Sequence, residues 1–278
     1  MKDAETLKAP VRPKPFLKWA GGKGQLLWQL EKYFPDTFKG YHEPFLGAGA
    51  VFFHLNPGEA YLSDQNEELI NAFLVVRDHL EELVRLLRLH KNNPEYYYFM
   101  RGLDSTSLGP VERASRFIYL NKTCFNGLYR VNKKGRFNVP FGRYKNPRYA
   151  DVDVLAAARS ALINTRAIDV ADFGIVLGRA APGDFVYFDP PYQPISETSR
   201  FTSYTPGSFD ACQQERLARV FGDLDTRGCR VLLSNSASEF IRDLYRGFRV
   251  ETVKAKRYIN CDKNRRSDID ELVVMNYD

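Results

Sequence analysis

The sequence lacks the features that would place it in a membrane or an oxidising compartment. No run approaches the ~20 apolar residues of a membrane-spanning helix, and the opening text MKDAETLKAPVRPKPF has no apolar stretch typical of a secretory signal. Its four cysteines, Cys124, Cys212, Cys229 and Cys261, are scattered without a C-x-x-C pair. That spacing disfavours a disulfide framework or a zinc site. We therefore expect a cytoplasmic protein with reduced cysteines, no metal and no membrane attachment.

Acidic residues are absent from residues 121–148, although the whole chain has 34 Asp and Glu against 40 Lys and Arg. The net charge of +6 is weak evidence by itself, because many basic proteins bind no nucleic acid. In this stretch, however, aromatic residues are interleaved with the cations. That combination favours a nucleic-acid surface over the alternative of a solvated surface loop.

Elsewhere, apolar strands alternate with helical patterns. We predict helices at 23–34, 65–89, 151–162, 211–227 and 238–245, and strands at 59–64, 165–170, 184–190, 229–235, 248–255 and 271–277. Such alternation predicts an α/β fold with a mostly parallel sheet, and the last strand is expected to be antiparallel after a basic loop at 254–266. Residues 66–150, mostly helical, interrupt the pattern. We expect a flexible tail at 1–15, one domain from 16–65 and 151–278, and an inserted domain at 66–150.

A glycine-rich turn and an acid follow two neighbouring predicted strands. EPFLGAGA supplies Gly47 and Gly49, and the next strand ends in Asp64. In doubly wound sheets such a turn lets a ligand approach, and an acid at this place accepts hydrogen bonds from ribose hydroxyls. An ordinary turn with a solvated Asp is the alternative, and the missing third glycine disfavours a dinucleotide.

DFVYFDPPYQP places a carboxylate, two prolines and an aromatic ring at the end of a predicted buried strand. Proline has no N–H donor, so the Asp189 carboxylate and the Pro190 carbonyl form an acceptor pair that suits a planar NH₂ group. Tyr192 offers a flat face for a ring. The stretch is therefore interpreted as a clamp for adenine or cytosine, with a simple strand-to-turn junction as the alternative.

Three ordered motifs, FLKWAGGK, EPFLGAG and DPPY, resemble the signature motifs of S-adenosylmethionine-dependent DNA adenine-N6 methyltransferases, in the alpha-class group that includes Dam and the Dpn-type enzymes. The resemblance covers residues 16–277 and extends to FNGLYRVN, FNVPFGRYKNP and SETSRFTSYT. It implies a Rossmann-like methyltransferase sheet with an inserted DNA-recognition domain. It also implies methyl transfer from S-adenosylmethionine, without a metal, to N6 of a flipped adenine in duplex DNA, within GATC.

The resemblance also implies residue roles around the cofactor and the target base. The expected cofactor contacts are Trp19, Lys23, Phe45, Gly47, Gly49, Asp64, Asp172, Phe173 and Asp189. The expected catalytic residues are Asp189, Pro190 and Tyr192. For Asp172 and Phe173, a helix N-cap and a core position are equally good interpretations.

On the DNA side, the resemblance implies that Lys18 contacts the first guanine of the site. Leu128, Arg130 and Pro140 match positions that read the rest of the half-site, and Phe125 and Asn126 match the segment that fills the opened duplex. The family often has Tyr in place of Phe125, so a flat ring is kept and a hydroxyl contact is lost. Tyr144 is expected to contact the backbone or the expelled base. The expected phosphate contacts are Lys122, Lys133, Lys134, Arg136, Arg143 and Arg148.

Several alternatives stay open. RNA adenine and protein glutamine methyltransferases also use an x-P-P-Y clamp, although they usually have Asn at its first position and lack this insertion. A non-catalytic DNA-binding module and a nucleotide-dependent oxidoreductase fit the motifs less well. The expected partner is double-stranded DNA, bound by a monomer through the insertion and the basic loop. A cognate restriction endonuclease acting on the same site is a further candidate partner.

Overall fold

The computed structural model describes residues 11–192, 209–256 and 268–278, in two compact units. The helical unit comprises residues up to Gly21, Ala48–Asn56 and Glu68–Asn164, and the sheet unit comprises Gly22–Gly47, Pro57–Glu67 and Thr165–Asp278. These bounds describe compactness, and the expected functional domain boundaries stay a prediction. The segment SETSRFTSYT and residues 257–266 of the basic loop lie outside the described residues.

The sheet unit contains a seven-stranded sheet. Its strands are β1 (Tyr41–Glu43), β2 (Ala60–Asp64), β3 (Thr165–Val170), β4 (Phe185–Phe188), β5 (Arg230–Ser236), β6 (Arg249–Lys256) and β7 (Asp268–Met275). The strand order is β3-β2-β1-β4-β5-β7-β6, and β7 pairs antiparallel with both β5 and β6. The predicted Rossmann-like, mostly parallel sheet and its antiparallel last strand are therefore confirmed.

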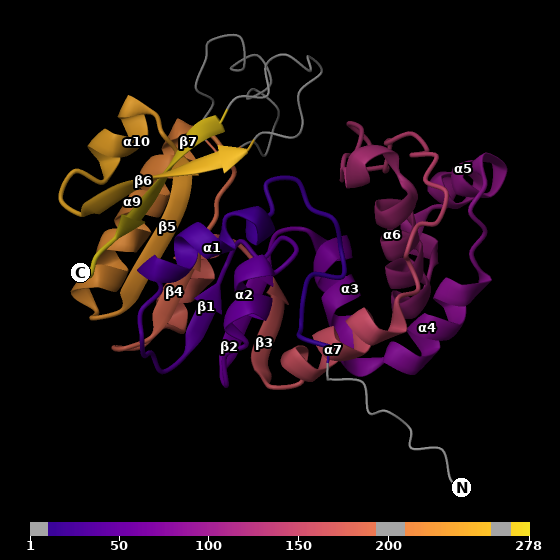
Figure 1. Cartoon of the computed structure of the whole chain (residues 1–278), viewed down its shortest axis with the longest axis horizontal. Helices are drawn as coiled ribbons and strands as arrows, with labels where there is room; N and C mark the ends of the chain where they lie inside the picture. Colours follow the sequence, from indigo (N-terminus) through magenta and orange to yellow (C-terminus); the bar gives the residue numbers. More distant parts are fainter. Residues whose placement is uncertain (1–10, 193–208, 257–267) are drawn as a thin grey trace, which may run out of the picture. The chain divides into compact units, whose positions relative to one another are not determined.

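One face of this sheet is covered by η5 (Phe173–Gly178), α9 (Ala211–Thr226) and α10 (Glu239–Leu244) (Figure 1). In α9 the apolar residues Leu217, Val220, Phe221 and Leu224 follow a helical period and are buried. They pack in one core cluster with alternate residues of the strands, which in β4 are Val186 and Phe188. The period-2 geometry of a strand explains this alternation.

The helix predicted for residues 23–34 is wrong. The structure has a 3₁₀ turn η1 (Lys23–Gln25), a short helix α1 (Leu27–Leu30) and a second 3₁₀ turn η2 (Glu31–Tyr33). No side chain caps either start, and Gly24 is a poor helix former. The break also lets the Lys23 side chain lie inside the unit, where it is 4% exposed.

The helical unit contains α2 (Ala50–Leu55), α3 (from Glu67 to Asp78), α4 (Leu80–Leu89), α5 (Pro94–Gly102), η3 (Ser105–Ser107), α6 (Pro110–Thr123), η4 (Phe125–Gly127) and α7 (Val152–Leu162). The predicted helix at 65–89 is two helices, because His79 leaves the helical region with φ −132° and ψ 36°. A core cluster joins α5 and α6 to residue Val139. No helix among the described residues is long and apolar enough to cross a membrane.

Candidate active site and candidate nucleic-acid interface

The candidate site lies where the strand order of the sheet reverses. β1 pairs with β2 on one side and with β4 on the other, and ligands of open α/β sheets bind outside the carboxyl ends of strands at such a point. The Gly47 turn follows β1, Asp64 ends β2, and Asp189 follows β4. These three predicted site residues therefore belong to the same edge of the sheet.

The glycine turn is joined directly to the acid of the next strand. Gly47 and Gly49 have φ values of 50° and 69°, which a residue with a Cβ rarely adopts. The backbone N–H of Gly47 donates to Asp64 Oδ2 at 3.0 Å, and Asn66 N–H donates to Oδ1 at 2.9 Å. Burial raises the pKa of Asp64, and these backbone donors oppose the rise. Asp64 therefore serves as a fixed acceptor beside the turn.

Asp172 and Phe173 have clear structural roles. Asp172 Oδ1 caps η5 by accepting from Gly174 N–H at 2.9 Å, and the guanidinium of Arg216 pairs with both carboxylate oxygens. These contacts with Arg216 lower the pKa of Asp172. Phe173 is buried and stacks on Phe45 with ring centroids 5.4 Å apart. The N-cap and core interpretations are thus present, and a cofactor contact by either residue stays a prediction.

Asp189 is held by two residues from distant parts of the chain. Lys23 Nζ lies 2.8 Å from its Oδ1, and Ser234 Oγ on β5 donates to the same oxygen at 3.0 Å. The hydroxyls of Ser234 and Tyr187 are hydrogen-bonded at 3.0 Å. Among the described residues, Oδ2 of Asp189 accepts no hydrogen bond. Among the described residues, the contacts that hold this side chain are therefore made through Oδ1.

The two prolines differ in their carbonyl partners. Gln214 of α9 donates to the Pro191 carbonyl at 3.0 Å and is itself held by Asn235 at 3.0 Å. The Pro190 carbonyl accepts no hydrogen bond from the described residues. The acceptor pair formed by Asp189 Oδ2 and the Pro190 oxygen stays a prediction.

Tyr192 completes this group through a residue that the motif did not identify. Its hydroxyl donates to Glu271 Oε2 of β7 at 2.6 Å, and Lys23 Nζ lies 4.6 Å from its ring centroid. Lys23 Nζ is also 3.8 Å from Glu271 Oε2. Burial raises the pKa of both Tyr192 and Glu271. Glu271, Ser234 and Gln214 lie outside the motifs from which the site is predicted, and the sequence signal for Glu271 is an acid within the apolar strand β7.

In the helical unit, the acid-free stretch after α6 forms a short hairpin. Val131 and Phe137 form an antiparallel bridge, and Asn138 N–H donates to the Arg130 carbonyl at 3.0 Å. The side chain of Asn132 closes the tip by accepting from the N–H groups of Lys134 and Arg136. We call residues 130–138 the hairpin.

The residues expected to read bases lie in or next to this hairpin. Arg130 is exposed, and its Nε donates to Asn138 Oδ1 at 2.7 Å. Leu128 is half-buried against the core of the unit, and Pro140 is exposed. Phe125 is 51% exposed, although it is large and apolar. An exposed ring beside a backbone turn suits the insertion role expected for it.

Lys18 and Trp19 also belong to the helical unit, whereas Lys23 belongs to the sheet unit. Lys18 Nζ lies 4.0 Å from the centroid of the Tyr144 ring. Trp19 stacks on Tyr129, with ring centroids 5.5 Å apart. The left-handed backbone of Gly127 lets the Lys18 stem pass where a Cβ would clash. The structure thus brings Lys18 and Tyr144 together, and the expected cofactor contact of Trp19 stays a prediction.

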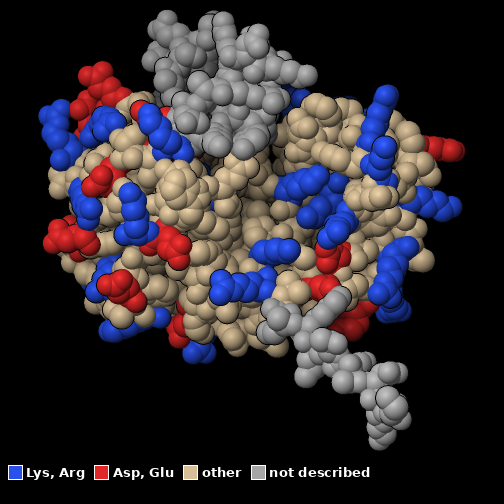
Figure 2. Space-filling view, viewed as in Figure 1, with Lys and Arg blue, Asp and Glu red and all other residues tan. Residues whose placement is uncertain are grey.

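The expected phosphate contacts differ in exposure. Lys122 is half-buried, and burial together with repulsion from Lys18 lowers its pKa to about 8. The exposed members are Lys133, Lys134, Arg136, Arg143 and Arg148, and Asn126, expected to fill the opened duplex, is also exposed. Figure 2 shows Lys and Arg side chains on this unit. The exposed cations are placed to neutralise phosphates, while Lys122 is only partly accessible.

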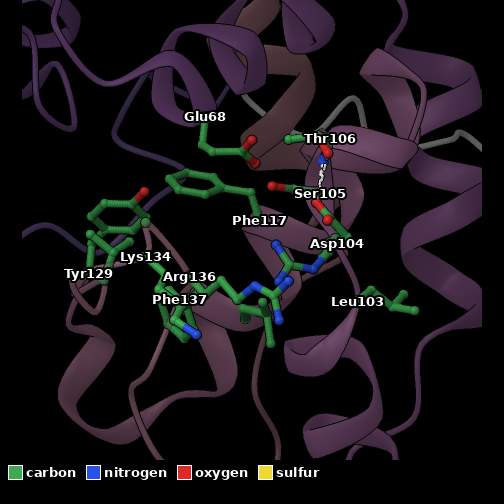
Figure 3. A pocket seen from close by; sticks show the side chains of 14 residues that line it. Glu68, Leu103, Asp104, Ser105, Thr106, Phe117, Tyr129, Lys134, Arg136 and Phe137 are labelled. Carbon is green, nitrogen blue, oxygen red and sulfur yellow. Dashed lines mark hydrogen bonds between the residues drawn. The ribbon is translucent and has the colours of Figure 1, made fainter.

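A cavity of about 240 Å³ lies behind the hairpin within the helical unit. Figure 3 shows the rings of Phe117 and Tyr129 on one side of it, and Asp104 with its neighbours on the other. Glu68 Oε2 is buried here without a hydrogen-bond partner among the described residues, whereas Oε1 pairs with Arg113 at 2.6 Å. The inner side of the hairpin is thus not close-packed at this point.

The comparisons with known proteins agree with this geometry. The family model for D12 class N6 adenine-specific DNA methyltransferases matches residues 19–259. The Type II methyltransferase M.MjaIII of Methanocaldococcus jannaschii is 44% identical over 95% of this chain and 99% of its own. The Type II methyltransferase M1.LlaDCHI of Lactococcus lactis subsp. cremoris is 42% identical over 97% of this chain and 98% of its own. The DNA adenine methylase of Escherichia coli (strain K12) is 36% identical over 94% of this chain and 95% of its own. The chain belongs to the D12 class of N6 adenine-specific DNA methyltransferases.

Proposed function

We propose that the enzyme transfers a methyl group from S-adenosylmethionine to N6 of an adenine that has left the duplex, within GATC. The observation that carries the proposal is the acceptor pair at the end of β4. Asp189 Oδ2 and the Pro190 carbonyl receive no hydrogen bond from the described residues, while Asp189 Oδ1 is held by Lys23 and Ser234.

The acceptor pair suits the chemistry of an aromatic amine. When both hydrogens of the amino group are accepted, the nitrogen becomes more tetrahedral and its lone pair is freed for attack. The Tyr192 ring would stack on the purine. The base must leave the helix first, which costs a few kcal/mol. After transfer the proton is expected to leave to solvent, and fixed dipoles and orientation supply the acceleration.

The residues at the switch point fit S-adenosylmethionine, which supplies an electrophilic methyl group on sulfur. Asp64 is a half-buried acceptor held by the Gly47 and Asn66 N–H groups, and an acid at this place suits the hydroxyls of a ribose. The Gly47 turn allows a close approach of the backbone, and Asp189, which is paired with Lys23, follows the neighbouring strand β4. Trp19, Phe45, Gly49, Asp172 and Phe173 stay proposed contacts.

Recognition of GATC is proposed for the helical unit. Arg130 can donate to guanine O6 and N7, and Leu128 and Pro140 suit a thymine methyl group. Lys18 would contact the first guanine. Binding by a monomer is proposed, and a restriction endonuclease that cuts the same site is a proposed partner, because two relatives carry Type II methyltransferase names.

The test is tritium transfer from labelled S-adenosylmethionine to two duplexes that differ only as GATC and GTTC. Label on GATC alone supports the proposal. Label on both, or on another DNA only, keeps the chemistry and rejects the site. Label on RNA or protein alone would favour the amide or RNA methyltransferase alternative. Asp189→Ala is expected to retain DNA affinity and lose turnover, and equal turnover would reject the acceptor-pair mechanism.

A further inference from the structure

The antiparallel strand β7 brings a carboxylate to the edge of the sheet where Asp189 lies. Because β7 runs antiparallel to β5, Glu271 is in register with Ser236 at the carboxyl end of β5. The residues that follow, Leu272 to Met275, are buried. Glu271 is 15% exposed and is thus a largely buried charge at the end of an apolar strand segment.

Glu271 contacts both Tyr192 and Lys23. Its Oε2 accepts from the Tyr192 hydroxyl at 2.6 Å and lies 3.8 Å from Lys23 Nζ. Lys23 Nζ is also 2.8 Å from Asp189 Oδ1. The Lys23 ammonium therefore lies between the carboxylates of Asp189 and Glu271. The Tyr192 hydroxyl is hydrogen-bonded to the carboxylate of Glu271.

The buried carboxylate of Glu271 stabilises the fold less than an apolar side chain at the same position would. Removing a carboxylate from water is costly even when it is paired, and replacing buried ion pairs by apolar residues is often neutral or stabilising. A β-branched or aliphatic residue would suit this position of β7 better. The presence of Glu271 is therefore better explained by its contacts with Tyr192 and Lys23 than by a gain in stability.

The hydroxyl of Tyr192 depends on this carboxylate. Among the described residues, Glu271 is the acceptor of the hydroxyl hydrogen. Burial raises the pKa of Tyr192, so the phenol stays protonated and acts as the donor. Without Glu271 the hydroxyl would have no acceptor there, and the ring would lose the contact that sets its orientation.

We propose that Glu271 is a positioning residue for methyl transfer. It orients the Tyr192 ring through the hydroxyl and shares the Lys23 ammonium with Asp189, so that Asp189 Oδ2 stays available to the target amino group. The inference rests on the proposed roles of Asp189 and Tyr192 at the adenine. It adds a residue outside the DPPY segment that acts through both of them.

The experiment compares two variants that remove different parts of the interaction. Glu271→Gln keeps an acceptor for Tyr192 and removes the charge beside Lys23, whereas Glu271→Leu removes both. We expect kcat to fall about 10- to 100-fold in Glu271→Leu and less in Glu271→Gln, because small displacements in an active site can cost ~100-fold. KM for DNA and for S-adenosylmethionine should change by less than about threefold.

The matched control is Asp270→Asn on the same strand. The carboxylate of Asp270 is half-exposed, and its Oδ1 lies 2.5 Å from Lys254 Nζ. Because neighbouring residues of a strand point to opposite faces of the sheet, Asp270 points away from the face of Glu271. It should keep wild-type kcat. Equal kcat in wild type and Glu271→Leu would overturn the proposal, as would a loss of kcat in Asp270→Asn as large as that in Glu271→Leu.

A double-mutant cycle with Tyr192→Phe separates positioning from general destabilisation. If Glu271 acts through the hydroxyl, Glu271→Leu should cost much less in the Tyr192→Phe background. Losses that simply multiply would overturn the proposed orientation of the Tyr192 ring by Glu271. Should Glu271→Leu fail to fold, the cycle is run with Glu271→Ala, which also removes the acceptor, and the melting temperature reports folding.

Failure of this inference can be told apart from failure of the proposed function. If Asp189→Ala keeps turnover, the acceptor-pair mechanism fails, whatever Glu271 does. If Asp189→Ala is inactive and Glu271→Leu is fully active, only the inference on Glu271 fails.

Discussion

The side-chain amide of Asn121 holds the backbone of Lys18 on both sides. Lys18 N–H donates to Asn121 Oδ1 at 2.8 Å, and Asn121 Nδ2 donates to the Lys18 carbonyl at 2.7 Å. Asn121 is 1% exposed and lies near the end of α6. The amide therefore ties the segment that carries Lys18 to the helix that precedes the hairpin.

Replacing Asn121 by Ala should destabilise the protein. Both backbone groups of Lys18 lose a buried partner, and each unsatisfied group costs about 1–3 kcal/mol. We expect the free energy of unfolding in urea to fall by about 2–4 kcal/mol. Asn71→Ala, which removes an exposed hydrogen bond to the Pro110 carbonyl, is the control and should cost less than about 1 kcal/mol. Equal losses in the two variants would contradict the role of Asn121.

Replacing Asp64 by Ala should weaken cofactor binding and spare DNA binding. Hydrogen bonds to a charged acceptor contribute about 1.5–3 kcal/mol, so the Kd for S-adenosylmethionine should rise about 10- to 100-fold. Calorimetric titration without DNA measures it. Asp169→Asn in β3, where the carboxylate pairs with Arg179, is the matched control. An unchanged Kd in Asp64→Ala would remove Asp64 from the cofactor site.

Arg130 and Lys133 should behave differently on DNA. Arg130→Ala should cost about 1–3 kcal/mol of binding to GATC and relax discrimination at one base pair, as expected for a base-reading arginine. Lys133→Ala should weaken binding about equally on all sequences and reduce the slope of log K against log salt by about 1. Binding to GATC and single-substituted duplexes at several salt concentrations tests both. Sequence-independent loss in Arg130→Ala would contradict its base-reading role.

His90 should make the folded protein less stable in mild acid. Burial lowers the pKa of this histidine to about 4, and its ring nitrogens are hydrogen-bonded to Tyr96 and Ser115. Between pH 6.5 and 4 the unfolded chain binds a proton that the folded chain does not, so this contribution to stability is lost as the pH falls from about 6.5 toward 4. The loss is on the order of 2–3 kcal/mol.

Urea unfolding of wild type and His90→Gln across this pH range measures the effect. His90→Gln should show a smaller decrease in stability between pH 6.5 and 4, whatever its stability at neutral pH. His54→Gln, at an exposed position, is the control and should follow wild type. Parallel curves for wild type and His90→Gln would show that other groups cause the acid sensitivity.

Local sequence patterns are enough to predict which residues at the ends of strands form the candidate site. The apolar run before Asp189, the glycine turn after β1 and the acid at the end of β2 are local features, and parallel pairing brings such ends to one edge of a sheet. The acid-free stretch with interleaved aromatics likewise predicts a nucleic-acid surface on the helical unit. These features depend on residue type and local spacing, which can be read along the chain.

Only the tertiary structure decided which groups hold Asp189 and Tyr192. The local pattern around Lys23 predicts a continuous helix. In the structure this segment is broken into short turns, and the Lys23 side chain is buried and paired with Asp189. Glu271 reaches Tyr192 because β7 enters the sheet antiparallel beside β5, and no local pattern encodes that neighbour. The orientation of Arg130 by Asn138 similarly follows from pairing across the hairpin. In each case the partner is set by how distant segments pair.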